Sequence, residues 1–248
     1  LRRYVGSEEY INDKERWCLW LKAASPTELK EIPAILARLK QVAEFRLKST
    51  KVATRKWADF PSLFIEERQP HSEYILVPRT SSENRKYIPI GYLSPDVIVS
   101  DGAIALPNAT LFHFGVLTSQ MHMAWVKYTC GRLKSDYRYS NTIVYNNFPW
   151  PSNPTEKQLE AVKKTAQAVL DARLAFPKSS LADLYHPSTM PPDLVKAHGA
   201  LDKAVDGCYS AQAFTTDDSR MELLFSMYGS LSQPLLPAAK AKGKAKKK

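Results

Sequence analysis

Cysteine and glycine are scarce in this chain, and their placement excludes several kinds of site. The three cysteines, Cys18, Cys130 and Cys208, lie far apart and form no CxxC pair. This spacing excludes the common zinc frameworks, argues against a disulfide scaffold and fits a reducing cytoplasm. The nine glycines are scattered, and no glycine-rich loop follows a strand-like segment. The sequence therefore predicts neither a nucleotide P-loop nor a dinucleotide-binding turn.

Long hydrophobic runs are missing as well. No stretch of about eighteen apolar residues occurs, so we expect no membrane span, and no signal peptide is recognisable. The 248 residues, of which 44% are hydrophobic, suit one large domain or two small ones. The chain opens at Leu1 inside a strand-like pattern, and we expect it to be a piece of a longer polypeptide.

Recognisable catalytic motifs are also lacking. The Asn-Pro-Pro-aromatic or Asp-Pro-Pro-Tyr tetrapeptide of amino methyltransferases does not occur. The segment 28–30 (Glu-Leu-Lys) matches one nuclease element but falls at a predicted helix start, and no nucleophile elbow is present. His113 and His122 lie on an apolar helical segment, where core or hydrogen-bonding roles fit best. We expect no catalytic residue, no metal and no cofactor in this chain.

Positive charge is in excess, but much of it lies at the end of the chain. The net charge is +10, and six of the last nine residues are lysines. Removing those six charges leaves +4, so the folded part is only mildly basic. We predict that the lysine-rich tail at 233–248 is disordered. Two roles stay open for it, sequence-blind affinity for DNA and solubility.

Capping boxes and apolar periodicity predict several helices. Ser25 begins the first, which Pro33 kinks or splits. The residues after Thr155 form an all-helical unit to about 230, and Asp217 favours a helix N-terminus. The predicted helices are 25–48, 110–130, one from Thr155, one from Pro191 and one from Asp217 to about Tyr228.

Short strands with turn signals between them fill much of the remaining chain. They lie at 16–21, 62–67, 73–78, 86–92 and 96–100. Their brevity indicates a small antiparallel or mixed sheet, and the crossover helices of a doubly wound fold are absent. The predicted fold class is α+β, with a small sheet and long helices followed by a small all-α domain.

The most informative stretch is 130–151, CGRLKSDYRYSNTIVYNNFPWP. Within it Lys134, Asp136 and Arg138 alternate with other residues, so on an extended strand they project from one face. Lys and Arg donate to guanine, and Asp accepts from cytosine N4, so this set matches the edges of base pairs. Alternating charge is also typical of the solvated face of any half-buried strand, and the spacing alone leaves both interpretations open.

Several long motifs of this chain carry a family resemblance. GRLKSDYRYS followed by IVYNNFPWP resembles the C-terminal region of MmeI-like (type IIL) restriction–modification enzymes. FGVLTSQMHMAWVKYTCGRL, SSENRKYIPIGYL and SSLADLYHPSTMPPDLVKAHGALDKAV fit the same family. In that family one polypeptide carries a nuclease, an adenine-N6 methyltransferase, a target recognition domain and a helical C-terminal part. This chain is similar to the last two, and the resemblance places it in the bacterial cytoplasm.

The resemblance also assigns roles to residues. It implies that Lys134 and Asp136 act together on one G·C pair, Lys134 on guanine and Asp136 on cytosine. It implies that Arg138 reads a neighbouring pair, for which guanine is the chemical preference. Tyr139 and Tyr145 are expected to be packing residues. Further candidates for DNA contact, mostly to phosphates, are Ser135, Arg132, Arg79, Ser81, Ser82 and Arg85.

The expected domains are a junction at 1–22, a target recognition domain at 23–151, a helical domain at 152–232 and the tail. The expected function is sequence-specific recognition of double-stranded DNA for an upstream methyltransferase domain, which binds S-adenosylmethionine. This module holds the duplex in register while the target adenine leaves the stack. Two alternatives stay open, a protein–protein interaction module and a single-strand binder that stacks bases on Tyr137, Tyr139 or Trp150.

Overall fold

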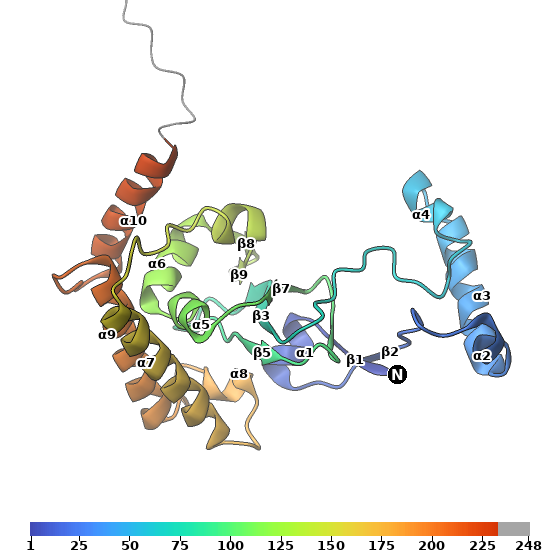
Figure 1. Cartoon of the computed structure of the whole chain (residues 1–248), viewed down its shortest axis with the longest axis horizontal. Coiled ribbons are helices and arrows are strands. Elements are labelled where there is room, and N and C mark those ends of the chain that lie inside the picture. The colour runs from blue at the N-terminus through green and yellow to red at the C-terminus, as the bar shows by residue number, and fades with distance from the viewer. Residues whose placement is uncertain (233–248) are drawn as a thin grey trace, which may run out of the picture.

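The computed structural model describes residues 1–232, and the prediction made for the tail at 233–248 lies outside them. Figure 1 shows a helical body, a central region of short strands and a helical arm on the opposite side. The predicted α+β class is confirmed. The strands are β1 Arg2–Val5, β2 Trp17–Cys18, β3 Tyr74–Pro78, β4 Thr80–Ser81, β5 Gly91–Leu93, β6 Ile98–Val99, β7 Ala103–Pro107, β8 Gly131–Leu133 and β9 Asp136–Arg138.

The helices provide most of the regular structure. They are α1 Ser7–Asn12, α2 Pro26–Lys30, α3 Pro33–Leu47, α4 Val52–Lys56, α5 Leu111–Leu117, α6 Gln120–Thr129, α7 Glu156–Leu174, α8 Leu181–Leu184, α9 Pro192–Tyr209 and α10 Asp217–Ser232, with a π-helical turn η1 at Asn141–Tyr145. The predicted capping box at Thr155 and Gln158 is present and starts α7. Pro33 lies at the first position of α3 and splits the first predicted helix, as expected.

The strands of the described residues form three small sheets. One has the order β2-β1-β6 and is mixed, because β1 pairs with β6 in parallel. The second, β5-β3-β7, is antiparallel, and its central strand β3 is buried along its whole length. The third, β4-β9-β8, joins two segments that are far apart in the chain. The sequence predicted one small antiparallel or mixed sheet, and the strands instead form three small sheets of these types.

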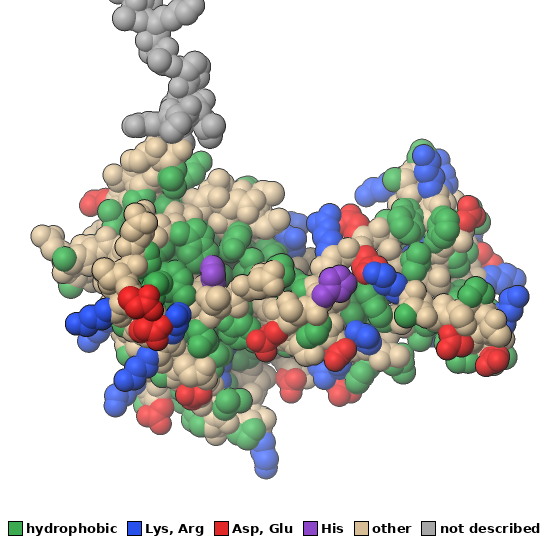
Figure 2. Space-filling model, viewed as in Figure 1, with side chains coloured by type: hydrophobic (Ala, Val, Ile, Leu, Met, Phe, Trp, Pro, Cys, Tyr) green, Lys and Arg blue, Asp and Glu red, His purple; other side chains and the backbone are tan. Residues whose placement is uncertain are grey.

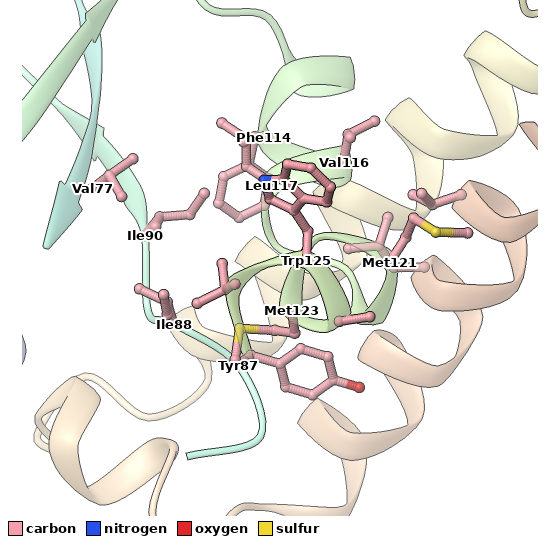
Figure 3. Close-up of a cluster of buried hydrophobic side chains, with 14 of the residues drawn as sticks. Val77, Tyr87, Ile88, Ile90, Phe114, Val116, Leu117, Met121, Met123 and Trp125 are labelled. Carbon is pink, nitrogen blue, oxygen red and sulfur yellow. The ribbon is translucent and has the colours of Figure 1, made fainter. Parts of the chain in front are cut away.

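The main hydrophobic core lies where α5 and α6 meet the sheets and the C-terminal helices (Figure 3). Phe114, Met121 and Trp125 are buried in it, together with Tyr87 and Ile90 from the strand region. The same core continues through the buried residues of α7 and α9, Val162, Ala166, Val169, Leu194 and Leu201. The helical part from 155 onward thus packs as one body with α5 and α6.

Several sequence predictions were wrong in detail. Residues 62–67 form turns and bends instead of a strand. The helix expected at 110–130 is interrupted at Thr118 and Ser119, and Ser119 caps α6. The Asp202 carboxylate accepts a hydrogen bond of 2.7 Å from the Gln120 amide at the same point. A carboxylate 82 residues away thus helps to start α6, and no local pattern reveals such a contact.

Two glycines in helices make a matched pair for testing this packing. A Cβ added to Gly115 of α5 would lie 2.7 Å from Val162 Cγ1 and 3.2 Å from the Ala166 Cβ of α7. A Cβ on Gly199 of α9 would meet nothing within 4 Å. We expect Gly115→Ala to lower the free energy of unfolding by about 1–3 kcal/mol through overpacking.

Gly199→Ala is the control, and it should raise the same free energy by up to about 1 kcal/mol because alanine is the better helix former. Urea unfolding of both variants measures the difference. If Gly115→Ala were as stable as Gly199→Ala, the close contact between α5 and α7 would be incorrect.

Candidate nucleic-acid interface

A two-stranded hairpin at 131–138 forms the centre of the candidate site. Its first strand, β8, begins at Gly131, two residues after α6 ends at Thr129. Strands β8 and β9 pair in register, with Leu133 opposite Asp136, and Lys134 and Ser135 form the turn between them. In β9 the Tyr137 side chain is buried, the Arg138 side chain is exposed and the Asp136 side chain is half-buried. This alternation presents Asp136 and Arg138 on the outer face.

Lys134 does not lie on that strand face, and the expectation that it would was wrong. It occupies the turn with φ of 56°, in the left-handed region that favours glycine. The side chains of Lys134 and Ser135 are exposed at the tip of the hairpin. A residue other than glycine, asparagine or aspartate here costs backbone strain, and such strain is concentrated at functional sites. The cation therefore projects from the tip, next to the face that carries Asp136 and Arg138.

The hairpin is anchored to strand β4 and to the hydrophobic core. Strand β4 pairs with β9, and the Tyr139 amide donates a 2.7 Å hydrogen bond to the Arg79 carbonyl. The Tyr139 hydroxyl lies 2.9 Å from His122 Nε2 inside the core. Burial lowers the pKa of His122 to about 3, so the ring is neutral at physiological pH. The predicted packing role of Tyr139 and hydrogen-bonding role of His122 are both confirmed, and they make the hairpin a rigid platform.

Asp136 is oriented by a loop that sequence analysis had assigned to phosphate contact. The Glu83 amide donates to Asp136 Oδ1 over 3.3 Å. Burial lowers the pKa of the half-buried Arg85, and the neighbouring Asp136 carboxylate opposes that shift. Arg85 Nη1 lies 3.5 Å from Ser81 Oγ. The Arg85 guanidinium therefore lies within electrostatic range of the Asp136 carboxylate.

The remaining candidates for DNA contact differ in their exposure and in the groups that they contact. Ser81 is buried, and the Ser82 hydroxyl accepts from the Asn84 amide, so both stabilise their own loop. Arg79 is half-buried. Arg132 stacks its guanidinium 4.2 Å from the Tyr137 ring centroid and donates to the Ser135 carbonyl over 2.9 Å. Arg132 therefore braces the hairpin turn.

A polar cavity of about 530 Å³ opens beside Asp136. The N-terminus of α1, a helix that the sequence did not predict, forms one wall of this cavity. The backbones of Gly6 and Gly102 lie close together there. A Cβ added to Gly6 would lie 3.4 Å from the Gly102 Cα. The cavity is lined by the start of α1, by the turn at 100–102 and by the loop at 80–85, with Asp136 at its edge.

The described residues hold no group of three or more His, Cys, Asp or Glu side chains arranged to bind a metal. Within the same part of the chain, no helix is long and apolar enough to cross a membrane. The Glu28 carboxylate of the nuclease-like tripeptide accepts from the Ser25 amide in a capping box. Asp217 lies at the start of α10, where its carboxylate accepts from Lys127 and Gln120.

The family comparison assigns this fold and hairpin to the class of target recognition domains. Residues 1–152 match the family model described as "MmeI, target recognition domain", and residues 154–236 match "MmeI, C-terminal domain". The chain belongs to the MmeI family.

Two proteins are similar to this chain over most of its length. DNA methyltransferase A of Bacillus subtilis (strain 168) is 39% identical over 232 residues, which are 94% of this chain and 26% of that protein. The solved structure of the Type IIL restriction-modification enzyme MmeI in complex with DNA is 47% identical, with a TM-score of 0.91. It covers 94% of this chain, which spans 31% of the solved one. The chain thus spans about a quarter of the curated relative.

Proposed function

We propose that this chain is the module that reads double-stranded DNA for an adenine-N6 methyltransferase of the restriction–modification type. The observation that carries the proposal is the braced hairpin, which exposes Lys134 at its tip and Asp136 and Arg138 on its outer face. The 47% identity to a protein whose structure was solved in complex with DNA supports it. A rigid support of this kind keeps reading side chains in place.

The chemistry of the three side chains gives each a role. Asp136 accepts a hydrogen bond from cytosine N4, and Lys134 donates to O6 and N7 of the paired guanine. Arg138 donates two parallel hydrogen bonds to a guanine of a neighbouring pair. The Glu83 backbone amide holds the carboxylate of Asp136 in position for its base contact. Ser135 and Arg79 remain candidates for contacts to the DNA backbone.

Methyl transfer requires S-adenosylmethionine, and its binding site is assigned to the longer polypeptide. The described residues contain no glycine-rich turn between a strand and a helix that could hold such a donor. The target adenine must leave the base stack to react. This chain's part in the reaction is to fix the register of the duplex.

The alternative of stacking single-stranded bases on tyrosines finds no support in the structure. Tyr137 and Tyr139 are 4% and 2% exposed, so their ring faces are covered by protein. Trp150 packs against the rings of His113, Tyr145 and Phe148. Stacking platforms must present a free ring face, and these rings instead hold the hairpin and the core together.

A binding series on the 248-residue chain tests the proposal. A duplex is first selected from a random pool and then compared with its separated strands and with duplexes that differ from it at one base pair. We expect a change within the site to cost about 1–3 kcal/mol and the single strands to bind more weakly. Equal affinity for all duplexes, or tighter binding to single strands, would contradict sequence-specific duplex reading.

A further inference from the structure

The arm formed by α2, α3, α4 and the loop to residue 64 leaves an unusual amount of apolar surface uncovered. Figure 2 shows apolar side chains gathered on the arm, on the right of the view. Phe45 is 77% exposed and Trp17, which faces the arm from β2, is 52% exposed. Exposed apolar surface of this extent is typical of an interaction site.

The arm keeps this surface open because a polar contact holds it together. The only buried side chain of α3 is that of Arg46. Arg46 Nη1 donates to the carbonyls of Trp57 and Phe60 over 2.8 Å, and Nη2 donates to the Leu63 carbonyl over 2.7 Å. These three hydrogen bonds fix the loop at 57–63 against α3. The apolar side chains of Ile32, Leu36 and Phe45 on this arm stay 49%, 40% and 77% exposed.

A largely apolar cavity of about 580 Å³ lies between α3, β2 and the end of this loop. Ile35, Leu39 and Val42 line it from α3, and Phe64 lines it from the loop. Phe45 follows Val42 by three residues, so it lies on the same side of the helix. We call this cavity together with Phe45 and Trp17 the arm groove.

The position of the first residue indicates what fills the groove. Leu1 itself lines the cavity, so any polypeptide joined to its amino group starts at the rim of the groove. The two similar proteins devote 26% and 31% of their length to the part that this chain matches. Most of each protein is therefore available to cover the groove, and apolar side chains are what would fit it.

We propose that the arm groove is the docking site for the domain that directly precedes Leu1 in the longer polypeptide. Burial of the groove fixes the arm against that domain and sets the distance between the hairpin and the rest of the protein. The proposal concerns folding and assembly alone, so it does not depend on which bases the hairpin reads, and its test needs no base preference.

The test compares thiol alkylation in the 248-residue chain and in the polypeptide that retains the residues encoded ahead of Leu1. The probe variant is Phe45→Cys, and the matched control is Leu174→Cys at the end of α7, which is 75% exposed. Mass spectrometry follows each site separately, so the three native cysteines do not interfere. Both sites tolerate a smaller side chain because neither is packed.

We expect alkylation of Phe45→Cys to slow by about tenfold or more in the longer polypeptide, because a covered thiol reacts only when the interface opens. Leu174→Cys should react at the same rate in both. Adding Ile35→Asp in the groove should restore fast alkylation at position 45 in the longer polypeptide.

Three results would overturn the proposal. Equal rates at position 45 in both proteins would show that the groove stays open. Slowing in the short chain as its concentration rises would point to a second copy in the groove, and slowing of the short chain on addition of duplex DNA would point to DNA.

Discussion

Exchanging the two charges of the hairpin, as Lys134→Asp with Asp136→Lys, should change the preferred base pair at one position of the recognition site. Lys134 projects from the turn and Asp136 from the start of β9. In the exchanged protein a cation occupies the position that accepted from cytosine, and an anion occupies the position that donated to guanine. Each contact is worth about 1–3 kcal/mol, or about 5- to 150-fold in affinity.

The expected result is a reversal, measured by competition among duplexes that carry each base pair at each position of the selected site. Affinity for unrelated duplex should hold, because the exchange leaves the net charge unchanged. The matched control is the same exchange in an exposed ion pair of α7, Glu160 and Lys163, which should not alter base preference. A loss spread evenly over all positions would count against direct reading.

A second variant distinguishes the effect of the Lys134 ammonium group from the effect of the backbone conformation of the turn. Because Lys134 has positive φ, Lys134→Gly relieves strain while it removes the ammonium group. We expect this variant to fold at least as stably as the original chain and yet to lose preference at the same base pair. Such a result would assign the preference to the Lys134 side chain, since the hairpin itself is kept.

The alternation of side chains along a strand predicted the outer face of β9, but not the position of the turn or the distant contacts. Strand periodicity placed Asp136 and Arg138 on one face and Tyr137 on the other, as β9 shows. It could not show where the turn falls, so Lys134 was assigned to the strand. The hydrogen bond from the Glu83 amide to Asp136 joins positions 53 residues apart, and a single sequence carries no signal for such a pairing.

The fold shows the same division between local and distant causes. Helices with capping boxes, such as α7, were predicted closely because the cap and the apolar stripe are both local. Strand β4 contains only two residues, too few for an alternating pattern, and was not predicted. The strand expected at 62–67 does not form. The Leu63 carbonyl accepts a hydrogen bond from Arg46 of α3, which fixes that segment against the helix.

Acidification should destabilise the protein through its buried histidines. Burial lowers the pKa of His122 from an ordinary value near 6.5 to about 3. Below about pH 6.5 the His122 ring therefore binds a proton in the unfolded chain but not in the folded chain. The free energy of unfolding falls as the pH falls from about 6.5 to about 3. Between pH 7.5 and 4.5 this one residue should remove about 2–3 kcal/mol from the free energy of unfolding.

His198 acts in the same direction. Its burial, together with the positive charges of Arg173 and Lys86, lowers its pKa well below the ordinary value. Asp202 acts in the opposite direction, because burial raises the pKa of its carboxyl and the folded state then gains the proton more readily. Urea unfolding at the two pH values therefore measures a sum, and a variant is needed to isolate His122.

The double variant His122→Phe with Tyr139→Phe isolates this contribution. It removes the ring nitrogen and the hydroxyl that lie 2.9 Å apart, so neither is left buried without a partner. At pH 7.5 the loss should stay within about 1.5 kcal/mol, as for other apolar replacements of similar volume. The difference in stability between pH 7.5 and 4.5 should shrink by about 2–3 kcal/mol relative to the original chain. An unchanged difference would mean that His122 is not the buried neutral group beneath the hairpin, and the rigid support inferred for the reading residues would lose its main contact.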